Sequence, residues 1–144
     1  MKVLRVVACV LAVGLLVAPM FSQAPAQVSI TLQPSGNNFV VVVSPDTVTV
    51  NQGGVVRWNS QGNSADSISI VFDSGGPFPT SGQPDNSARG RYQKGVGQQI
   101  ITAGAADPGD WKYSVTWTTA DGTAYVVDPV VSVRRLRSSV IGHR

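Results

Sequence analysis

The sequence predicts an all-β fold, a two-sheet antiparallel sandwich, on three observations. Apolar residues recur at every second position in several short segments, the spacing that places alternate side chains on one face of a sheet. Clusters of Gly, Pro, Asn, Asp and Ser separate these segments, and no segment carries a sustained apolar stripe of period 3.6. The chain has no Glu and is rich in Val, Thr, Ser and Gly, a composition that favours strands over helices.

Each predicted strand has its own pattern. The run from Phe39 to Val43 is apolar throughout, which predicts a strand buried on both faces. The clearest alternation is Trp111, Tyr113, Val115 and Trp117, and we expect this face to point inward because the intervening residues are polar or charged. In chain order, the predicted strands are 28–32, 39–43, 47–50, 56–58, 67–72, 100–101 and 111–117, and then 124–127 leading into 130–133.

Turn residues connect these strands with one exception. Asp121-Gly122 gives the strongest hairpin signal, because Asp-Gly supplies the positive φ angles of a tight turn. The segment from Asp73 to Gly95 is instead a long stretch rich in Gly, Pro, Ser and Asn with few apolar anchors. Structureless loops of this length are uncommon in compact domains, so the segment is either a functional contact loop or a floppy connection.

The first 26 residues have the layout of a secretory signal peptide. Lys2 and Arg5 precede an apolar run from Val6 to Ala18, and Ala24-Pro25-Ala26 offers a cleavage site after Ala26. The apolar run is shorter than the about 20 residues that a membrane span needs, although retention as an anchor stays open as the alternative. The prediction is therefore an exported protein, periplasmic or extracellular, with a domain at 27–134 and a basic, flexible tail at 135–144.

Composition after residue 26 limits both stability and chemistry. Cys9, Met1 and Met20 all lie in the signal segment, so the exported chain has no cysteine and no methionine, and its single histidine is His143. Without disulfides, the domain depends on burial alone for its stability. Nine Lys or Arg and eight Asp leave a net charge near +1, which gives little attraction to nucleic acid.

The order of several motifs resembles the cupredoxins. The motifs are Pro45–Val50 with its Pro-x-x-Val-x-Val spacing, the Gly53-Gly54 turn, Val56-Arg57-Trp58-Asn59, Pro108–Val115 and Asp128–Val133. The resemblance covers most of residues 28–134 and implies a Greek-key sandwich. In that family the sandwich carries a copper centre for electron transfer.

The copper ligands of that family have no counterpart here. A blue-copper site needs two imidazoles and a thiolate, usually with an axial thioether. In the resembling register these positions fall at Asp66 or Ser67, Val115, Thr118 and Thr123. None of these side chains is a soft copper ligand, so the resemblance is to a cupredoxin-like domain without its metal, and we expect no cofactor.

Catalysis is not expected either. The lone His143 stands next to the end of the chain, which excludes a Ser-His-Asp arrangement. Asp107 and Asp110 bracket Pro108-Gly109 and have a turn explanation, although a hydrolase that uses these carboxylates remains a competing hypothesis. No glycine-rich phosphate loop and no calcium loop occur in the sequence.

The sequence is therefore interpreted as an exported, non-catalytic binding or assembly module. Its expected partner is another exported protein or an envelope component, with an anionic surface as a weaker option through the basic tail and no nucleic acid expected. The alternative is an accessory protein of an exported electron-transfer chain without its own metal. Candidate contact residues lie at the long loop and the tail: Phe78, Arg89, Arg91, Tyr92, Lys94, Arg134, Arg135 and Arg137.

Overall fold

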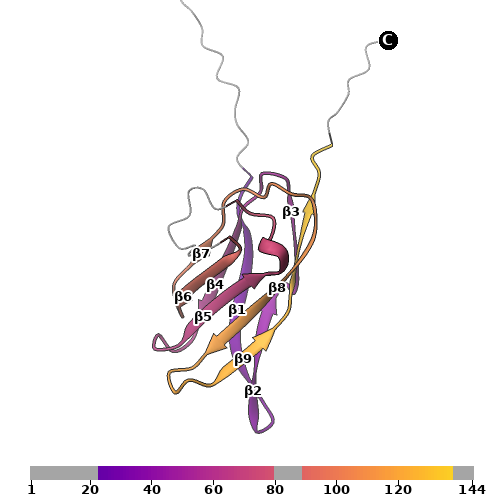
Figure 1. The fold of residues 1–144 in the computed structure, drawn as a ribbon. Helices are drawn as coiled ribbons and strands as arrows, with labels where there is room; N and C mark the ends of the chain where they lie inside the picture. The colour runs from indigo at the N-terminus through magenta and orange to yellow at the C-terminus, as the bar shows by residue number, and fades with distance from the viewer. Residues whose placement is uncertain (1–22, 80–88, 138–144) are drawn as a thin grey trace, which may run out of the picture.

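In the part of the chain that the structure describes, ten strands pair into two facing sheets, which confirms the all-β sandwich (Figure 1). The structure is a computed structural model and describes residues 23–79 and 89–137. The strands are β1 (Ala26–Ser35), β2 (Asn38–Ser44), β3 (Thr47–Asn51), β4 (Val56–Gln61), β5 (Ser67–Phe72), β6 (Arg91–Gly95), β7 (Ile100–Ile101), β8 (Gly109–Thr118), β9 (Ala124–Val127) and β10 (Val130–Arg134), and a short 3-10 turn, η1 (Asp73–Gly75), follows β5.

The two sheets are interleaved along the chain. One sheet has the order β2-β1-β4-β7, and the other has the order β3-β10-β8-β5-β6, with β9 pairing to β8 beside β10. The pairs β1/β4 and β10/β3 are parallel, and the other described pairs are antiparallel. The sequence indicated antiparallel pairing throughout. β1 pairs with β4, and β10 pairs with β3. In both pairs a long stretch of chain lies between the two strands, so they are not bound to the antiparallel direction that a hairpin imposes.

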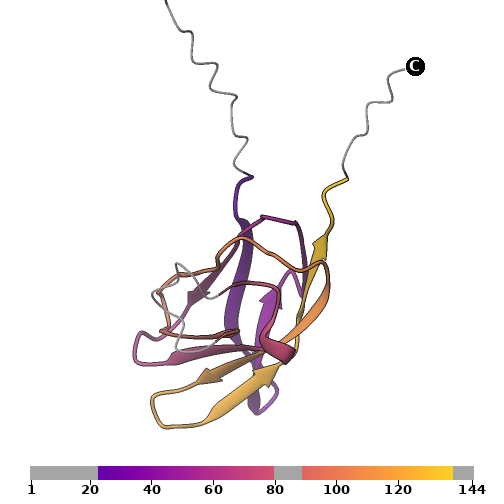
Figure 2. The same cartoon turned by 45° about the horizontal axis from the view of Figure 1, so that its top comes forward.

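Two hairpins close the end of the sandwich opposite to the described chain ends (Figures 1 and 2). The β1–β2 hairpin turns at Gly36-Asn37, where Gly36 has a φ of +59° that suits glycine. The β8–β9 hairpin lies where the sequence predicted it, but its loop is five residues long, the Gly122 N–H donates to the Thr119 carbonyl, and of the Asp121-Gly122 pair only Gly122 has a positive φ. There the Asp121 carboxylate accepts hydrogen bonds from the Thr119 hydroxyl and the Thr123 backbone N–H. These hydrogen bonds lower the pKa of Asp121, and the bond from the Thr119 hydroxyl has the largest effect.

Two predictions about the strands are wrong. Phe39 and Val40 are 45% and 44% exposed, so the run from Phe39 to Val43 is not buried on both faces. The reason is that β2 lies at the edge of its sheet. The segment from Asp73 to Gly95 is not structureless either, because it starts with η1 and ends with β6, which pairs with β5.

Aromatic side chains fill the space between the sheets. The Trp58 ring contacts the rings of Phe72, Phe78, Tyr92 and Tyr113, with centroids 5.7 to 6.4 Å apart. The Trp58 indole N–H also donates to the Tyr113 hydroxyl at 3.2 Å. The central tryptophan contributes a large buried apolar surface to this core, and the hydrogen bond of its N–H fixes the orientation of the ring.

Tyr113, Val115 and Trp117 of the predicted inward ladder are fully buried. Trp111, the fourth member, packs against the core but is only partly buried, because it lies near the edge of the core, where β8 begins.

We predict that the fold loses stability in alkali. Burial raises the pKa of Tyr92 and of Tyr113 to about 12, against 10.0 for an ordinary tyrosine. The folded state therefore keeps both phenols protonated while the unfolded chain ionises, so the stabilisation is complete below pH 10 and is lost as the pH rises toward 12. Urea unfolding between pH 8 and 11.5 should show a loss of about 1.4 kcal/mol per pH unit for each tyrosine above pH 10.

The control for this prediction is Tyr92→Phe. The Tyr92 hydroxyl is buried without a hydrogen-bond partner, so its removal leaves no donor or acceptor behind. The Phe variant should lose stability above pH 10 with about half the slope that the two tyrosines give together. An unfolding free energy that is constant from pH 9 to 11.5, or an unchanged slope in Tyr92→Phe, contradicts the prediction.

The described residues include the last four residues of the predicted signal segment. Most of the predicted signal peptide, residues 1–22, lies outside the described residues, as do 138–144 of the predicted tail. Ala26 is already part of β1, and its N–H donates to the Val55 carbonyl at 2.9 Å. Within the described residues, no helix has the length and apolar character needed to cross a membrane.

Candidate functional site

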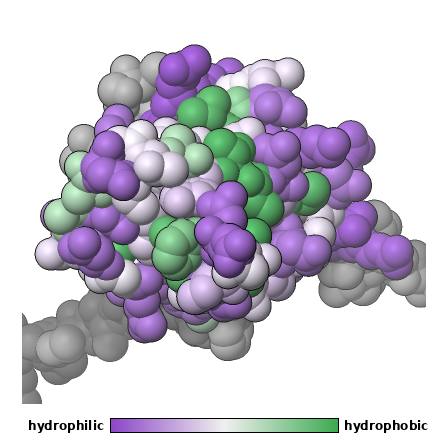
Figure 3. Space-filling model, turned by 90° about the horizontal axis from the view of Figure 1, so that it is seen from below, coloured by the Kyte–Doolittle hydropathy of each residue, from purple (hydrophilic) through white to green (hydrophobic). Residues whose placement is uncertain are grey.

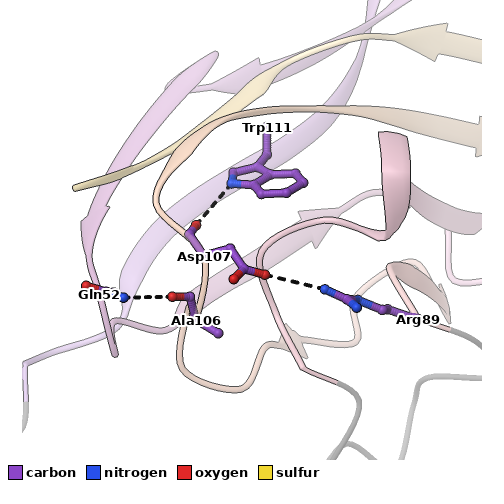
Figure 4. Close-up of polar contacts among 5 residues, drawn as sticks. All are labelled: Gln52, Arg89, Ala106, Asp107 and Trp111. Carbon is purple, nitrogen blue, oxygen red and sulfur yellow. Dashed lines mark hydrogen bonds and ion pairs between the residues drawn. The ribbon is translucent and has the colours of Figure 1, made fainter. Parts of the chain in front are cut away.

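A set of polar contacts ties three loops together at one side of β8 (Figure 4). Arg89 donates to the Asp107 carboxylate at 3.4 Å, and the Trp111 indole N–H donates to the Asp107 carbonyl at 3.1 Å. Gln52 donates to the carbonyl of Ala106 at 2.9 Å. The loops after β3, before β6 and before β8 therefore meet at residues 106 and 107.

The Arg89–Asp107 ion pair is a surface contact. Both side chains are more than half exposed, so water screens the pair and its contribution to stability is at most about 1 kcal/mol. The Arg89 side chain also runs across Gly75, where an added Cβ would lie 3.3 Å from its Cδ. Arg89 is thus held near η1 while its guanidinium stays accessible to a partner.

A shallow groove lies beside this contact set. Two adjoining cavities of about 160 and 320 Å³ share Asp73 and Lys112 in their walls. The smaller cavity is also lined by Tyr113, Ser114 and Asp128, and the larger one by Ser74, Asp110 and Trp111. Small-molecule sites usually enclose about 300 to 1,000 Å³ and are mostly apolar. This groove is open and polar, unlike the enclosed, mostly apolar sites that usually hold small molecules.

The strand register brings the groove residues together. Asp110, Lys112 and Ser114 alternate along β8 and so share its outward face. Phe72 pairs with Tyr113, so the next residue of the chain, Asp73, comes beside Lys112. Serine hydroxyls hold two of the carboxylates, since Ser114 donates to Asp128 at 2.7 Å and Ser132 donates to Asp110 at 2.6 Å. Each of these carboxylates keeps a second oxygen for a ligand.

The backbone of η1 is strained where it borders the groove. Ser74 has a φ of +55°, the only positive φ of a residue other than glycine in the described chain, and Gly75 and Gly76 also have positive φ. A side chain in this left-handed region costs about 1 kcal/mol, and such residues concentrate at functional sites. The strain presents the Ser74 side chain at the wall of the larger cavity.

The predicted contact residues divide into buried and exposed ones. Phe78 and Tyr92 are each 1% exposed, so their assignment to a contact surface is wrong. Both rings pack on Trp58 in the core, which explains why the long loop carries aromatic residues at all.

The charged candidates do lie at the surface. Arg89 and Arg91 are exposed, Lys94 is partly exposed on β6, and Arg134, Arg135 and Arg137 are exposed at and beyond the end of β10. Residues 80–88 of the long loop and the tail from 138 onward, with Arg144, lie outside the described residues.

The groove itself was not predicted. Asp110 was interpreted as a turn residue, and Lys112 and Ser114 as an ordinary solvated face. The alternation along β8 was the available signal, but it does not show that Asp73 and Asp128 flank that face. Their position follows from pairing across β5, β8 and β10, which a single sequence does not specify.

The copper-ligand positions of the resembling register hold structural side chains. The Asp66 carboxylate is buried and accepts hydrogen bonds from the Trp117 indole N–H at 2.9 Å and the Ala120 backbone N–H at 3.0 Å. Val115 is fully buried in the core, and Thr118 and Thr123 flank the β8–β9 turn. Asp66 thus fastens the β8–β9 hairpin to the loop before β5. Within the described residues, no group of three or more His, Cys, Asp or Glu side chains is placed to hold a metal ion.

The pair of carboxylates considered for hydrolysis has structural partners. Asp107 binds Arg89, and Asp110 accepts the hydroxyl hydrogen bond from Ser132. Retaining or inverting hydrolysis requires one carboxyl group with a raised pKa opposite a second one. Separate partners for Asp107 and Asp110 do not provide that arrangement.

Comparison with known proteins adds a likeness of fold. Among solved structures, the chain is similar to a protein described as a purple cupredoxin from Nitrosopumilus maritimus, with 18% identity, a TM-score of 0.43, and coverage of 75% of this chain and 98% of that chain. No protein-family model and no curated protein matches the sequence.

Proposed function

We propose that this chain is an exported binding or assembly module that works without a metal ion of its own. Its contact surface is the groove of Asp73, Ser74, Asp110, Lys112 and Asp128 together with Arg89 at its rim. The observation that carries the proposal is this accessible set of charges of both signs, fixed by serine hydroxyls and a strained turn on a rigid sandwich. Rigid sandwiches commonly carry binding function on such loops and strand faces.

The side chains at the copper-ligand positions support the metal-free part of the proposal. Asp66 is engaged by Trp117 and Ala120, and Val115 contributes only alkyl surface to the core. An oxygen ligand of this kind, already bonded twice, is a poor match to the soft trigonal set of a blue-copper centre. The basic and apolar N-terminal segment, followed by Ala24-Pro25-Ala26, supports the exported location.

The experiment is site-specific photo-crosslinking in the intact cell envelope. A photoreactive side chain at Lys112 should give a discrete adduct with one exported protein or envelope component. The same group at Gln33, an exposed residue on the outer face of the other sheet, is the matched control and should give no adduct with a different protein. The double variant Asp73→Lys/Asp110→Lys, with the crosslinker at Ser74, should lose the adduct at least tenfold because it reverses the charge of the groove.

Four outcomes decide the proposal. Adducts of equal yield from Lys112 and Gln33, or adducts that persist in the charge-reversed variant, remove the groove as the contact surface. Copper added to the purified protein should produce no strong visible band, and stoichiometric uptake with such a band overturns the metal-free assignment. An adduct with an exported oxidase or cytochrome supports the groove but assigns the chain to the accessory role in electron transfer.

A further inference from the structure

The edge strand β2 is unprotected against pairing with another strand. Within the described residues, β2 pairs with β1 only, and its seven residues, Asn-Phe-Val-Val-Val-Val-Ser, include no charge and no proline. Natural sheets usually guard an edge with lysine, proline, a bulge or a very short strand. The absence of such a device leaves a line of backbone donors and acceptors beside β-branched side chains.

Within the described residues, the other edge strands are shorter than β2 or carry charge, and the uncharged β9, which pairs with β8 only, has four residues. On the same sheet, the opposite edge strand β7 has two residues. On the facing sheet, the edge strand β6 carries Arg91 and Lys94, and the edge strand β3 has five residues and follows the Pro45 bend. The contrast makes β2 the long, uncharged edge of this sandwich.

The hairpin register shows which backbone groups of β2 face outward. Ser35 pairs with Asn38 across the two-residue turn, and the closing pair of such a turn is hydrogen-bonded. Because donors alternate along a strand, Phe39, Val41 and Val43 turn their N–H and C=O groups away from β1. A side-chain hydrogen bond supports this alternation. Asn38 Oδ1 accepts the Phe39 N–H at 2.9 Å, so this N–H is not directed at β1.

Apolar side chains accompany this edge. Phe39 and Val40 are nearly half exposed, and the Phe39 ring meets the Tyr125 ring of β9 edge to face at 6.0 Å. Figure 3 views the molecule from the end that carries the β1–β2 hairpin and shows apolar surface gathered on this end. Burial of this surface would favour association at about 25 cal/mol per Å² before the entropic costs of binding.

We propose that two copies of this chain associate through β2, antiparallel about a two-fold axis at Val41. In this register Val41 pairs with Val41 of the second copy, and Phe39 pairs with its Val43. These outward-facing pairs can form about four backbone hydrogen bonds, because the Phe39 N–H of each copy is already bonded to Asn38 Oδ1. The two four-stranded sheets become one continuous sheet across the axis.

The sequence of β2 favours a second copy over another partner. A two-fold interface brings each residue against its symmetry mate, so the same patch must be complementary to itself. Four consecutive valines satisfy this condition, because Val40 lies opposite Val42 of the second copy and no charge opposes a like charge along the strand. The proposal does not depend on the groove, which lies on the outward face of the other sheet.

The association should be weak, because a single edge strand buries less than a standard interface of about 800 Å² per partner. We expect a dissociation constant on the order of 10 μM for the exported, processed protein. Sedimentation velocity from 1 μM to 1 mM should show a reversible shift from monomer to dimer. A chain that stays monomeric at 1 mM overturns the proposal.

Charge variants test the register directly. In Val40→Lys/Val42→Lys, lysines face lysines across the axis, and the dissociation constant should rise at least a hundredfold. Val40→Asp/Val42→Asp should be monomeric for the same reason, and an equimolar mixture of the two variants should form a heterodimer. Val126→Lys on β9, at an exposed valine outside the paired edge, is the matched control and should dimerise as the unmodified chain does.

Circular dichroism of each variant checks that the fold is intact, which is expected because Val40 and Val42 lie on the outer face of the sheet. Dimers that persist in the Lys/Lys variant, or a mixture that forms no heterodimer, overturn the pairing about Val41. A loss of dimer in Val126→Lys equal to that in the Lys/Lys variant also overturns it, because the interface would then include β9.

Discussion

Replacement of Asp66 by alanine should destabilise the domain by about 3 to 5 kcal/mol. The Asp66 carboxylate accepts from the Trp117 indole N–H and from the Ala120 N–H, and Trp117 is fully buried. Its removal leaves a buried indole donor and a backbone donor without acceptors, which costs more than the net value of the two bonds. Urea unfolding followed by circular dichroism measures the loss.

Two further variants separate the hydrogen bonds from general effects on the hairpin. Asp66→Asn keeps one acceptor oxygen but turns its NH₂ group toward the second donor, so its loss should lie between zero and that of the alanine variant. Asp121→Ala removes an exposed carboxylate from the same hairpin and should cost clearly less than Asp66→Ala. A loss below 1 kcal/mol in Asp66→Ala contradicts the anchoring role of Asp66.

Replacement of Trp58 by alanine should cost about 4 to 5 kcal/mol, in the upper range for a buried aromatic residue. The indole contacts four aromatic rings at once, and its N–H satisfies the Tyr113 hydroxyl. Domains of this size are stable by about 5 to 15 kcal/mol, so the alanine variant can fall close to the unfolding limit.

Trp58→Phe provides a measurable variant if Trp58→Ala does not fold. It leaves a smaller void and one lost hydrogen bond, and we expect a loss of about 2 to 3 kcal/mol. Trp111→Ala is the matched control, because this indole is only partly buried and packs at the margin of the core, and it should cost about 1 kcal/mol. Equal losses for Trp58→Ala and Trp111→Ala contradict the central position of Trp58 in the core.

Most of the strands that the sequence located share one property. These strands, which do not include β7 and β9, have two or more buried apolar residues, as in the ladder of Tyr113, Val115 and Trp117, so their alternation is visible without a structure. The strand β6 was missed because its Arg-Tyr-Gln-Lys-Gly sequence buries only Tyr92. An edge strand needs few apolar residues, and a single aromatic residue among polar ones has the appearance of a loop.

The errors at the predicted contact surface have a related cause. Phe78 and Tyr92 stand in polar surroundings in the sequence, which suggested exposed aromatic contacts. In the structure both cover the same tryptophan from the long segment between β5 and β7. The copper-ligand positions of the resembling register were easier to interpret. Whether Asp66 or Val115 is a soft copper ligand depends on the type of side chain alone. The role of Asp66 as a hairpin anchor required the distance to Trp117, which only the fold provides.

The position of β10 determines when the sandwich can close during biosynthesis. This strand lies between β3 and β8, pairing Val131 with Val48 on one side and with Trp111 on the other. A nascent chain that ends before residue 130 therefore leaves β3 detached from the remainder of its sheet. Pairings this remote along the polypeptide form slowly. Completion of this sheet therefore waits for the last described strand of the polypeptide.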